Sequence, residues 1–214
     1  MTYIFWEAIF STGQVKYLEI NYDEKVPGYG VKERCSNMAV DILVGGSAGQ
    51  GMETMMNLLG KTLVREHFNL IYTKDYMSRV RGGHNFSRLR IAESIPWSTA
   101  GSIDIMIALN EDTYHLHRDS LRDTGKVLFD PEQFSLPKEE KRGVAVKFKA
   151  LAMEAGSAVM ANTVAVGAIL MMIGLDLETM EELLKESFAN KEKVVRENLT
   201  ALSSGYAAAK EASA

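Results

Sequence analysis

The segment that most constrains the fold is residues 38–67, where an apolar run leads through a glycine-rich turn into an amphipathic stretch: MAVDILVGGSAGQGMETMMNLLGKTLVREH. The run at residues 40–46 is typical of a buried strand. From Met52 to about His67, apolar side chains then recur at three- and four-residue intervals. A strand that enters a helix through a tight glycine turn opens many layered α/β domains. The segment therefore predicts such a domain, with the methionine- and leucine-rich stripe of its helix in the core.

The rest of the chain continues this alternation of strand and helix signals. Strands are predicted at residues 69–76, 84–92, 103–110, 125–130 and 143–150, and helices at 111–122, 153–174, after Asp176 and at 191–210. The third of these strands is apolar on both faces, as expected for a central parallel strand covered by helices. In the second, Phe86, Leu89 and Ile91 are predicted to share one face, opposite two arginines. Together the signals predict an α/β fold, a Rossmann-like three-layer domain with a mostly parallel sheet.

The first 37 residues differ from the rest of the chain, because they mix charges, Pro27 and turn-forming residues without sustained periodicity. We treat residues 1–37 as an N-terminal appendage and residues 38–214 as the domain proper. One hypothesis is that Met38 is the natural start, since Lys32-Glu33 is compatible with a purine-rich ribosome-binding sequence just upstream. The alternative is a short hairpin or tail that packs on the domain.

Composition argues against several classes of function. The chain has 24 Lys and Arg against 28 Asp and Glu, and it lacks the basic block or basic–aromatic stripe that suits a nucleic-acid backbone. Its one cysteine, Cys35, supplies neither a disulfide framework nor the thiolates of a zinc site or an iron–sulfur cluster. The longest apolar stretch, residues 158–175, contains Asn162 and Thr163 and is interpreted as a buried helix. We therefore expect a cytoplasmic protein with no nucleic-acid partner and no membrane segment.

The glycine turn Gly46-Ser47-Ala48-Gly49-Gln50-Gly51 is the first candidate site. Its spacing imitates the dinucleotide fingerprint, in which backbone N–H groups at a helix start face a pyrophosphate. However, Ala48 occupies the position of the middle glycine, and Asp75 comes later than the acidic residue expected about 20 residues further on. No Gly-Lys-Ser/Thr completes a Walker loop. The turn is assigned to an anion or a partner protein, with dinucleotide binding as the alternative.

The second candidate site is YMSRVRGGHNFSRLR at residues 76–90, where Arg79, Arg81, Arg88 and Arg90 surround Gly82-Gly83 together with His84. Guanidinium groups match carboxylates and phosphates in bidentate fashion. Because no acidic residue lies among these fifteen, we interpret the segment as an anion or subunit contact. The alternative is a surface loop whose arginines pair with acidic residues of the same chain.

Other polar residues are given structural roles. His115 and His117 are two residues apart on a predicted helix, so their side chains diverge; they make a poor metal pair and are expected to face solvent. His67 is expected to interact with carbonyls at a helix end. Asn162 and Thr163 are expected to be hydrogen-bonded within the core, with a partner-facing role as the alternative.

Three segments together resemble the gamma subunit, or gamma domain, of the 2-oxoacid:ferredoxin oxidoreductases: GGSAGQG after one strand, DYMSRVRGGHNFSRLRI after the next, and ANTVAVGAIL in a later helix. The likeness extends from Met38 to about Ala209. The family's Gly-x-Gly-Gly-Gln-Gly turn is matched at Gly46, Gly49, Gln50 and Gly51 and departs at Ala48, and its Arg-Gly-Gly motif is matched at Arg81, Gly82 and Gly83.

The resemblance implies a heteromeric enzyme that decarboxylates a 2-oxoacid such as pyruvate or 2-oxoglutarate on thiamine diphosphate. Electrons would pass through iron–sulfur clusters to ferredoxin, and an acyl-CoA would be released. The Gly-Asp-Gly thiamine segment of that family is absent from this sequence, and one cysteine cannot hold a cluster. Thiamine diphosphate, magnesium and the clusters are therefore expected on partners, namely thiamine-binding alpha/beta-type subunits and a ferredoxin-like subunit.

For this chain itself, the resemblance implies a subunit interface and coenzyme A binding, without a catalytic residue, a metal ligand or activity of its own. The residues expected at the CoA site are Gly46, Gly49, Gln50, Gly51, Arg79, Arg81, Gly82 and Gly83. The alternative function is a free-standing Rossmann-like protein that binds a nucleotide. Ala48 and the position of Asp75 argue against that alternative.

Overall fold

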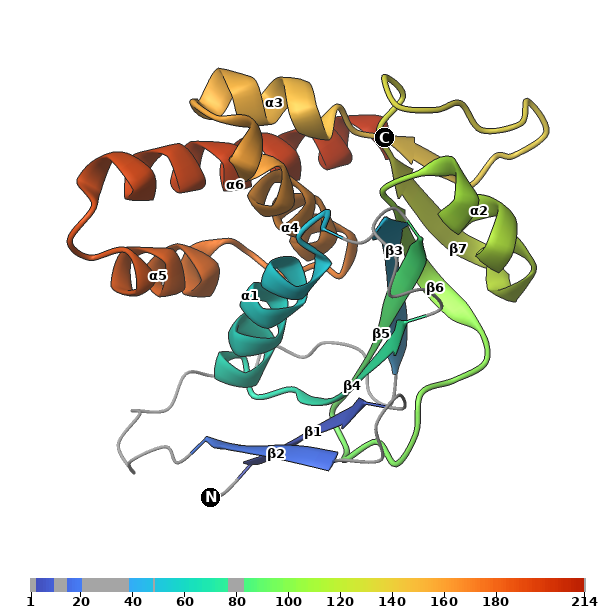
Figure 1. Ribbon diagram of the computed structural model, residues 1–214, viewed down its shortest axis with the longest axis horizontal. Helices are drawn as coiled ribbons and strands as arrows, with labels where there is room; N and C mark the ends of the chain where they lie inside the picture. Colours follow the sequence, from blue (N-terminus) through green and yellow to red (C-terminus); the bar gives the residue numbers. More distant parts are fainter. Residues whose placement is uncertain (1–2, 10–14, 21–38, 48, 77–82, 214) are drawn as a thin grey trace.

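Figure 1 shows a computed structural model in which one mixed sheet carries most of the helices on one face. The structure describes residues 3–9, 15–20, 39–47, 49–76 and 83–213. Within these ranges the strands are β1 (Tyr3–Ile9), β2 (Val15–Ile20), β3 (Val40–Ser47), β4 (Asn69–Tyr76), β5 (His84–Ala92), β6 (Ile103–Ala108), β7 (Leu121–Phe129) and β8 (Gly143–Ala145). The α-helices are α1 (Met52–Arg65), α2 (Glu111–His117), α3 (Phe148–Ala155), α4 (Ala161–Met172), α5 (Glu178–Ser187) and α6 (Glu192–Ala212), and the short 3-10 helices are η1 (Arg118–Ser120) and η2 (Ala158–Met160).

The strands are ordered β2-β1-β4-β5-β3-β6-β7-β8 across the sheet. Among these eight, β5 and β2 oppose the common direction, because β5 pairs antiparallel with both β3 and β4, and β2 with β1. The other neighbouring pairs are parallel. The predicted α/β class with a mostly parallel sheet is therefore confirmed.

The antiparallel direction of β5 brings two distant segments to one edge of the sheet. Its first residue, His84, lies opposite Ser47, the last residue of β3, and Tyr76 at the end of β4 lies opposite Asn85. We call this edge, marked by Ser47, Tyr76 and His84, the carboxyl edge. Ligands of open α/β sheets are commonly held at such an edge.

Two apolar clusters cover the two faces of the sheet. The larger one joins Ile42 of β3 and Leu89 of β5 to α1 and the C-terminal helices. The smaller one joins Leu43 of β3 to Tyr114 of α2 and to Phe134 in the loop that follows β7. Because successive residues of β3 belong to opposite clusters, this strand is buried on both faces, which gives the predicted three layers. The stripe of α1 lies in the larger cluster, as predicted.

The helices α4 and α6 cross at very short distance beside the sheet. Thr163 Oγ1 donates a 2.7 Å hydrogen bond to Asn198 Oδ1, and both residues are buried. The Asn198 amide in turn donates to the carbonyl of Val194 at 2.8 Å. The core role predicted for Thr163 is thus confirmed. Among the helices formed by the described residues, none is long and apolar enough to cross a membrane.

The prediction for β5 is wrong about one face. Phe86 does not share a face with Leu89 and Ile91; it packs against the smaller cluster, on the side of the sheet that carries α2. Asn85 and Ser87 take the buried positions in line with Leu89 and Ile91. Hydrogen bonding makes this possible, since the Ser87 hydroxyl lies 3.2 Å from the Tyr72 hydroxyl.

The predicted strand at 143–150 is wrong in its second half, and the predicted helix at 111–122 is too long. β8 ends at Ala145 and α3 begins at Phe148. The reason lies outside the segment: the buried carboxylate of Asp130, just after β7, accepts the backbone N–H of Lys149 at 3.2 Å and so satisfies a donor in the first turn of α3. The helix at 111 ends at His117, and β7 already begins at Leu121.

The predicted helix at 153–174 is wrong as one element, because α3 ends at Ala155, Gly156 follows with φ 133°, and α4 begins only at Ala161. The other boundaries lie close to those predicted. α1 ends at Arg65. Two residues further on, His67 has φ 64° and donates its backbone N–H to the carbonyl of Val64 at 3.0 Å. In the predicted appendage, β1 and β2 form an antiparallel pair, and β1 pairs with β4. The position of the natural start codon stays a prediction.

Candidate functional site

The glycine turn lies at the carboxyl edge, between β3 and α1. Gly49 and Gly51 have φ values of 95° and 76°, a backbone region that side chains with a Cβ rarely adopt. The Gln50 side chain closes the turn, because its Oε1 accepts the backbone N–H of Ser47 at 2.6 Å. The Gln50 backbone N–H donates back to the Ser47 carbonyl at 3.2 Å. Three of the predicted residues thus shape one turn, whereas Ala48 lies outside the described residues.

The start of α1 faces this turn without a side-chain cap. Its first backbone N–H groups are therefore free of an intrahelical acceptor and carry the positive end of the helix dipole. The start of α4 adjoins the same place: a Cβ at Gly51 would lie 3.0 Å from Cγ of Asn162. The glycine at 51 thus allows both the left-handed backbone and the approach of the Asn162 amide.

Asn110, two residues after the end of β6, connects the glycine turn to α2. Its Nδ2 donates to Ser47 Oγ at 3.1 Å. Its Oδ1 accepts the backbone N–H of Thr113 at 3.1 Å and the Thr113 hydroxyl at 2.7 Å, so it caps α2. Thr113 is fully buried in space left by Gly45, where a Cβ would lie 2.8 Å from Oγ1. One side chain therefore fixes three elements at the carboxyl edge.

We expect Asn110→Ala to lower the free energy of unfolding by about 1–2 kcal/mol, because it removes an N-cap together with the bond to Ser47. Asn110→Asp keeps the acceptor for Thr113 and is expected to retain most of the stability. Urea denaturation of the three proteins measures both effects. Equal unfolding midpoints for wild type and Asn110→Ala would contradict the anchoring role.

A buried cation lies beside the start of α1. Lys74 of β4 has a side chain that is only 7% exposed, and its Nζ donates to Glu53 Oε1 at 2.8 Å. The ammonium also lies 5.4 Å from the centre of the Tyr72 ring. Glu53, in the first turn of α1, is largely solvent-exposed. An ion pair therefore joins β4 to the first turn of α1.

A pair of histidines lies at the same edge. His84 and His117 approach with their Nε2 atoms 3.0 Å apart, and the His117 ring stands edge-on to Phe86 with ring centres 4.5 Å apart. His117 is 8% exposed, so the prediction that it faces solvent is wrong. His115 does face solvent, beside Glu111.

The two imidazoles are held in the neutral form. Burial, followed by the charges of His84 and Arg88, lowers the pKa of His117 to about 4. Burial also lowers the pKa of His84, and the nearby Asp112 carboxylate partly opposes that shift. At neutral pH one ring therefore donates a hydrogen bond and the other accepts it.

The predicted arginine segment is described only in part. Arg79, Arg81 and Gly82 lie outside the described residues, whereas Gly83 directly precedes His84 at the carboxyl edge. The other two arginines are bonded within the chain: Arg88 donates to the carbonyl of Ala100 at 3.0 Å, and Arg90 pairs with Asp41 at 3.5 Å. For Arg90 the alternative of an ion pair with an acidic residue of the same chain is therefore confirmed, whereas Arg88 bonds a backbone carbonyl.

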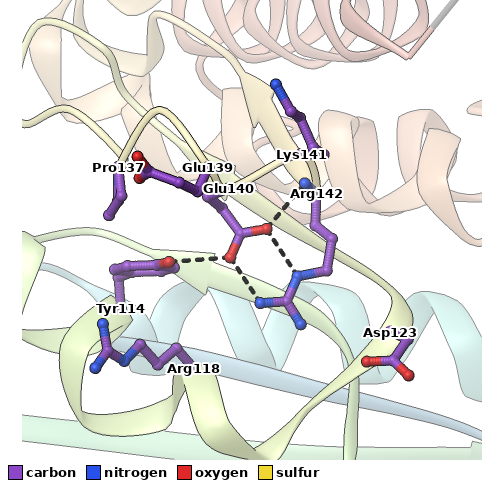
Figure 2. A pocket seen from close by; sticks show the side chains of 8 residues that line it. All are labelled: Tyr114, Arg118, Asp123, Pro137, Glu139, Glu140, Lys141 and Arg142. Atoms are coloured by element: carbon purple, nitrogen blue, oxygen red, sulfur yellow. Dashed lines mark hydrogen bonds and ion pairs between the residues drawn. The ribbon is translucent and has the colours of Figure 1, made fainter.

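A separate hollow of about 520 Å³ lies between α2 and the loop before β8. Figure 2 shows Arg118 and Lys141 on its wall, extending away from Glu140 and Arg142. The Tyr114 hydroxyl donates to Glu140 Oε2 at 2.9 Å, and Arg142 holds both carboxylate oxygens, at 2.7 Å from Nε and 2.6 Å from Nη2.

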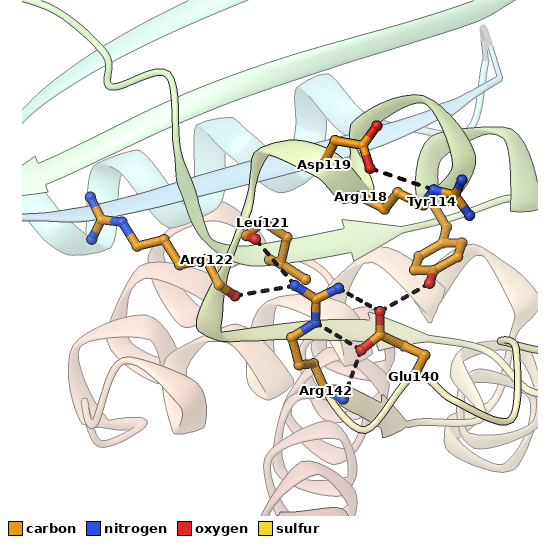
Figure 3. Close-up of polar contacts among 7 residues, drawn as sticks. All are labelled: Tyr114, Arg118, Asp119, Leu121, Arg122, Glu140 and Arg142. Carbon is orange, nitrogen blue, oxygen red and sulfur yellow. Dashed lines mark hydrogen bonds and ion pairs between the residues drawn. The ribbon is translucent and has the colours of Figure 1, made fainter.

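The contacts of Arg142 continue into the sheet. Figure 3 shows its Nη1 directed at the carbonyls of Leu121 and Arg122, at 3.1 and 3.3 Å. The hydrogen bonds from Arg142 lower the pKa of Glu140 to about 2. Burial, together with Glu140, raises the pKa of Tyr114. Because the polar groups of Tyr114, Glu140 and Arg142 are bonded to one another, we assign these three residues a structural role and call them the clasp. The clasp holds the loop before β8, and we do not assign it a ligand.

Within the part of the chain that the structure describes, no group of three or more His, Cys, Asp or Glu side chains is arranged to hold a metal ion. The groups at this edge that sequence reasoning missed are Lys74, Asn110 and His117. Lys74 and His117 depend on partners from distant elements, so their spacing along the sequence carried no signal. Asn110 has a local signal, because an asparagine just before a predicted helix is a typical N-cap.

The sequence model of the family described as pyruvate ferredoxin/flavodoxin oxidoreductase matches residues 41–208. This range is most of the chain and contains both candidate segments. The chain therefore belongs to this family, and the predicted relationship to 2-oxoacid:ferredoxin oxidoreductase subunits is confirmed at that level.

Two curated relatives illustrate the range of chain lengths. The ketoisovalerate oxidoreductase subunit VorA of Methanothermobacter thermautotrophicus is 29% identical over 175 residues, which cover 80% of this chain but only 37% of the relative. The 2-oxoglutarate synthase subunit KorC of Methanocaldococcus jannaschii is 27% identical over 188 residues, which cover 85% of this chain and 100% of the relative. This chain thus spans little more than a third of some relatives and the full length of another.

Solved structures share the fold. The gamma subunit of a keto/oxoacid ferredoxin oxidoreductase from Geobacter sulfurreducens has a TM-score of 0.71 at 22% identity, with 82% of this chain and 98% of that chain covered. The 2-oxoglutarate:ferredoxin oxidoreductase of Magnetococcus marinus was solved with 2-oxoglutarate, coenzyme A and succinyl-CoA bound. Its TM-score is 0.74 at 22% identity, with 81% of this chain and 31% of that chain covered. At these identities the likeness shows the fold.

Proposed function

We propose that this chain is the gamma subunit of a thiamine-diphosphate-dependent 2-oxoacid:ferredoxin oxidoreductase, and that it contributes a subunit interface and part of the CoA site. The observation that carries the proposal is the meeting of both family segments at the carboxyl edge, where His84, next to Gly83, lies opposite Ser47 of the glycine turn. The family match over residues 41–208 supports it.

The chemistry of the carboxyl edge suits the phosphates of CoA. In this proposal Gly46, Gly49, Gln50 and Gly51 shape the turn, so that N–H groups at the start of α1 face the anion. The buried ammonium of Lys74, paired with Glu53, holds β4 against that helix start. Arg79 and Arg81 would supply guanidinium forks next to Gly82 and Gly83. The Magnetococcus marinus relative carries CoA in its structure, which is consistent with this ligand.

The sheet order argues against the alternative of a free-standing dinucleotide-binding protein. In that class the strand after the first helix neighbours the first strand, and its acidic residue reaches the ribose. Here β5 separates β4 from β3. Asp75 of β4 is therefore one strand spacing, about 4.8 Å, further from the glycine turn than it would be if β4 lay directly beside β3. Asp75 is therefore poorly placed for a ribose bound at Gly49 and Gly51.

The remaining chemistry would belong to partners. Thiamine diphosphate, magnesium and iron–sulfur clusters are proposed on alpha/beta-type and ferredoxin-like subunits, with ferredoxin as electron acceptor, because one cysteine cannot ligate a cluster. Alone, the chain would be inactive. The oxoacid is proposed to be pyruvate, 2-oxoglutarate or a related acid, and a panel of 2-oxoacids tested on the native complex identifies it.

The test is Arg81→Ala in the assembled complex, assayed anaerobically by viologen reduction with varied CoA. We expect the KM for CoA to rise about tenfold, since one charge-assisted hydrogen bond to a phosphate is lost. Arg118→Ala, which changes an exposed arginine on the wall of the separate hollow, is the matched control and should leave the KM unchanged. Unchanged CoA dependence together with unchanged assembly in Arg81→Ala would refute the CoA role.

A further inference from the structure

The histidine pair lies at the junction of the two family segments. His84 is the first residue of β5 and lies opposite Ser47, the last residue of β3, while its chain neighbour Gly83 belongs to the Gly-Gly pair. Glycine allows wide backbone freedom, so Gly83 does not itself fix the direction of the chain at this point. Backbone pairing with β3 holds the start of β5, and contacts of the His84 side chain add a second restraint at the point where the chain leaves Gly83.

The His84 side chain contacts His117, which belongs to a different element. It is the last residue of α2, and its Nε2 lies 3.0 Å from His84 Nε2. Phe86 supports both rings, stacked at 5.9 Å from the His84 ring and edge-on at 4.5 Å from the His117 ring. α2 is in turn capped by Asn110, which is bonded to Ser47 of the glycine turn. A continuous set of contacts thus runs from the glycine turn through α2 to the start of β5.

A role as a metal site fits this pair poorly. The pair offers two nitrogen ligands, and the charge of Arg88 acts on His117, which disfavours a second cation there. A purely apolar role also fits poorly, because the buried His117 ring and the half-buried His84 ring carry nitrogens that need hydrogen bonds, whereas phenylalanine or leucine would fill the space without that requirement. The pair is better explained by the specific direction that a hydrogen bond imposes.

We infer that His117 is a positioning residue for the CoA site, and that its hydrogen bond to His84 fixes Gly83 and the start of β5 against the glycine turn. This inference rests on the proposed function. His117 itself touches no ligand in this scheme. Its contribution is preorganisation, because a binding site whose elements are already held in place loses less freedom when the ligand binds.

The test is His117→Phe in the assembled complex, with steady-state kinetics in CoA and in the 2-oxoacid. Phenylalanine keeps a ring against Phe86 but removes the hydrogen bond to His84. We expect the KM for CoA to rise about three- to tenfold, the range of one lost hydrogen bond, with kcat at saturating CoA and the KM for the oxoacid unchanged. His117→Gln, whose amide can replace Nε2, should restore the wild-type KM, and the exposed His115→Phe should change nothing.

The pH profile gives a second readout. One protonated imidazole can still donate to the other ring, so the hydrogen bond is lost only when both rings bind a proton, and in the wild type the KM for CoA should rise as the pH falls toward 4. The groups whose charges act on the pair are Arg88 of β5 and Asp112 of α2. The acid-dependent part of the rise should be weaker in His117→Phe, which leaves a single imidazole.

The outcomes separate this inference from the proposed function. A raised KM in Arg81→Ala with a wild-type KM in His117→Phe would overturn the inference and leave the CoA role standing. Unchanged CoA kinetics in both variants would overturn both. An equal loss of kcat for every substrate in His117→Phe, not restored by His117→Gln, would show a general structural role and would also overturn the inference.

Discussion

Gly205→Ala is expected to lower the free energy of unfolding by about 3 kcal/mol, although the same change in an open helix stabilises a protein by about 1 kcal/mol. A Cβ at Gly205 would lie 2.7 Å from the carbonyl carbon and 2.9 Å from the Cα of Val164. These are backbone atoms of α4, so no side chain can rotate away. Gly167 of α4 meets α6 in the same manner, with Leu202 C at 3.0 Å from the position of a Cβ. The methyl group must therefore push the two helices apart.

Urea unfolding of the full chain, followed by circular dichroism, measures this effect. Gly101→Ala is the matched control, because a Cβ at Gly101 has open space and its backbone is not in the left-handed region. The control should stay within about 0.5 kcal/mol of wild type. A wild-type unfolding midpoint in Gly205→Ala would contradict the backbone contact between α4 and α6.

Local sequence patterns are sufficient to predict most of the elements. β4 and β5 occupy the residues predicted for them, and α1 differs from its prediction only at its C-terminal end. The reason is that apolar periodicity in these segments reports burial on one face of a strand or helix, and the structure buries those faces. The glycine turn can also be predicted, since the positive φ values of Gly49 and Gly51 are the property for which glycine is used at such turns.

Pairing between distant segments cannot be predicted in the same way. The position of β5 between β3 and β4 decides that His84 meets Ser47, and no local pattern encodes that order. The face of Phe86 is predicted wrongly because the polar pair Asn85 and Ser87 obscures the alternation.

Burial of polar residues is equally hidden from local patterns. Helical spacing places His117 in solvent because it describes only the helix that carries it, whereas the burial of His117 comes from β5. No pattern marks Lys74, because its ion pair with Glu53 joins β4 to α1. In each case a tertiary contact overrides the ordinary preference of a charged or titratable side chain for water.

Glu140→Gln is expected to lower the free energy of unfolding by about 2–3 kcal/mol at pH 7, because a buried charged acceptor loses its strongest hydrogen bonds. The Glu140 side chain is 5% exposed and accepts hydrogen bonds from Tyr114, from the Arg142 backbone and from two guanidinium nitrogens of Arg142. A neutral amide loses the charge and presents a donor to the arginine, which has no acceptor to offer. The bonds of Arg142 to the Leu121 and Arg122 carbonyls remain, so the loop before β8 should loosen without loss of the sheet.

The same clasp predicts a defined acid dependence. The pKa of Glu140 is about 2 in the folded chain against an ordinary value of 4.5, so the unfolded chain binds the proton more readily. Its stabilisation is therefore complete above pH 4.5 and is lost as the pH falls from 4.5 through 2. Urea unfolding of wild type and Glu140→Gln at several pH values should give a difference that shrinks over this range. Glu139→Gln, an exposed neighbour, is the control and should match wild type throughout. A difference that stays constant down to pH 2, or an equal loss in Glu139→Gln, would show that the carboxylate of Glu140 does not hold the loop through its charge.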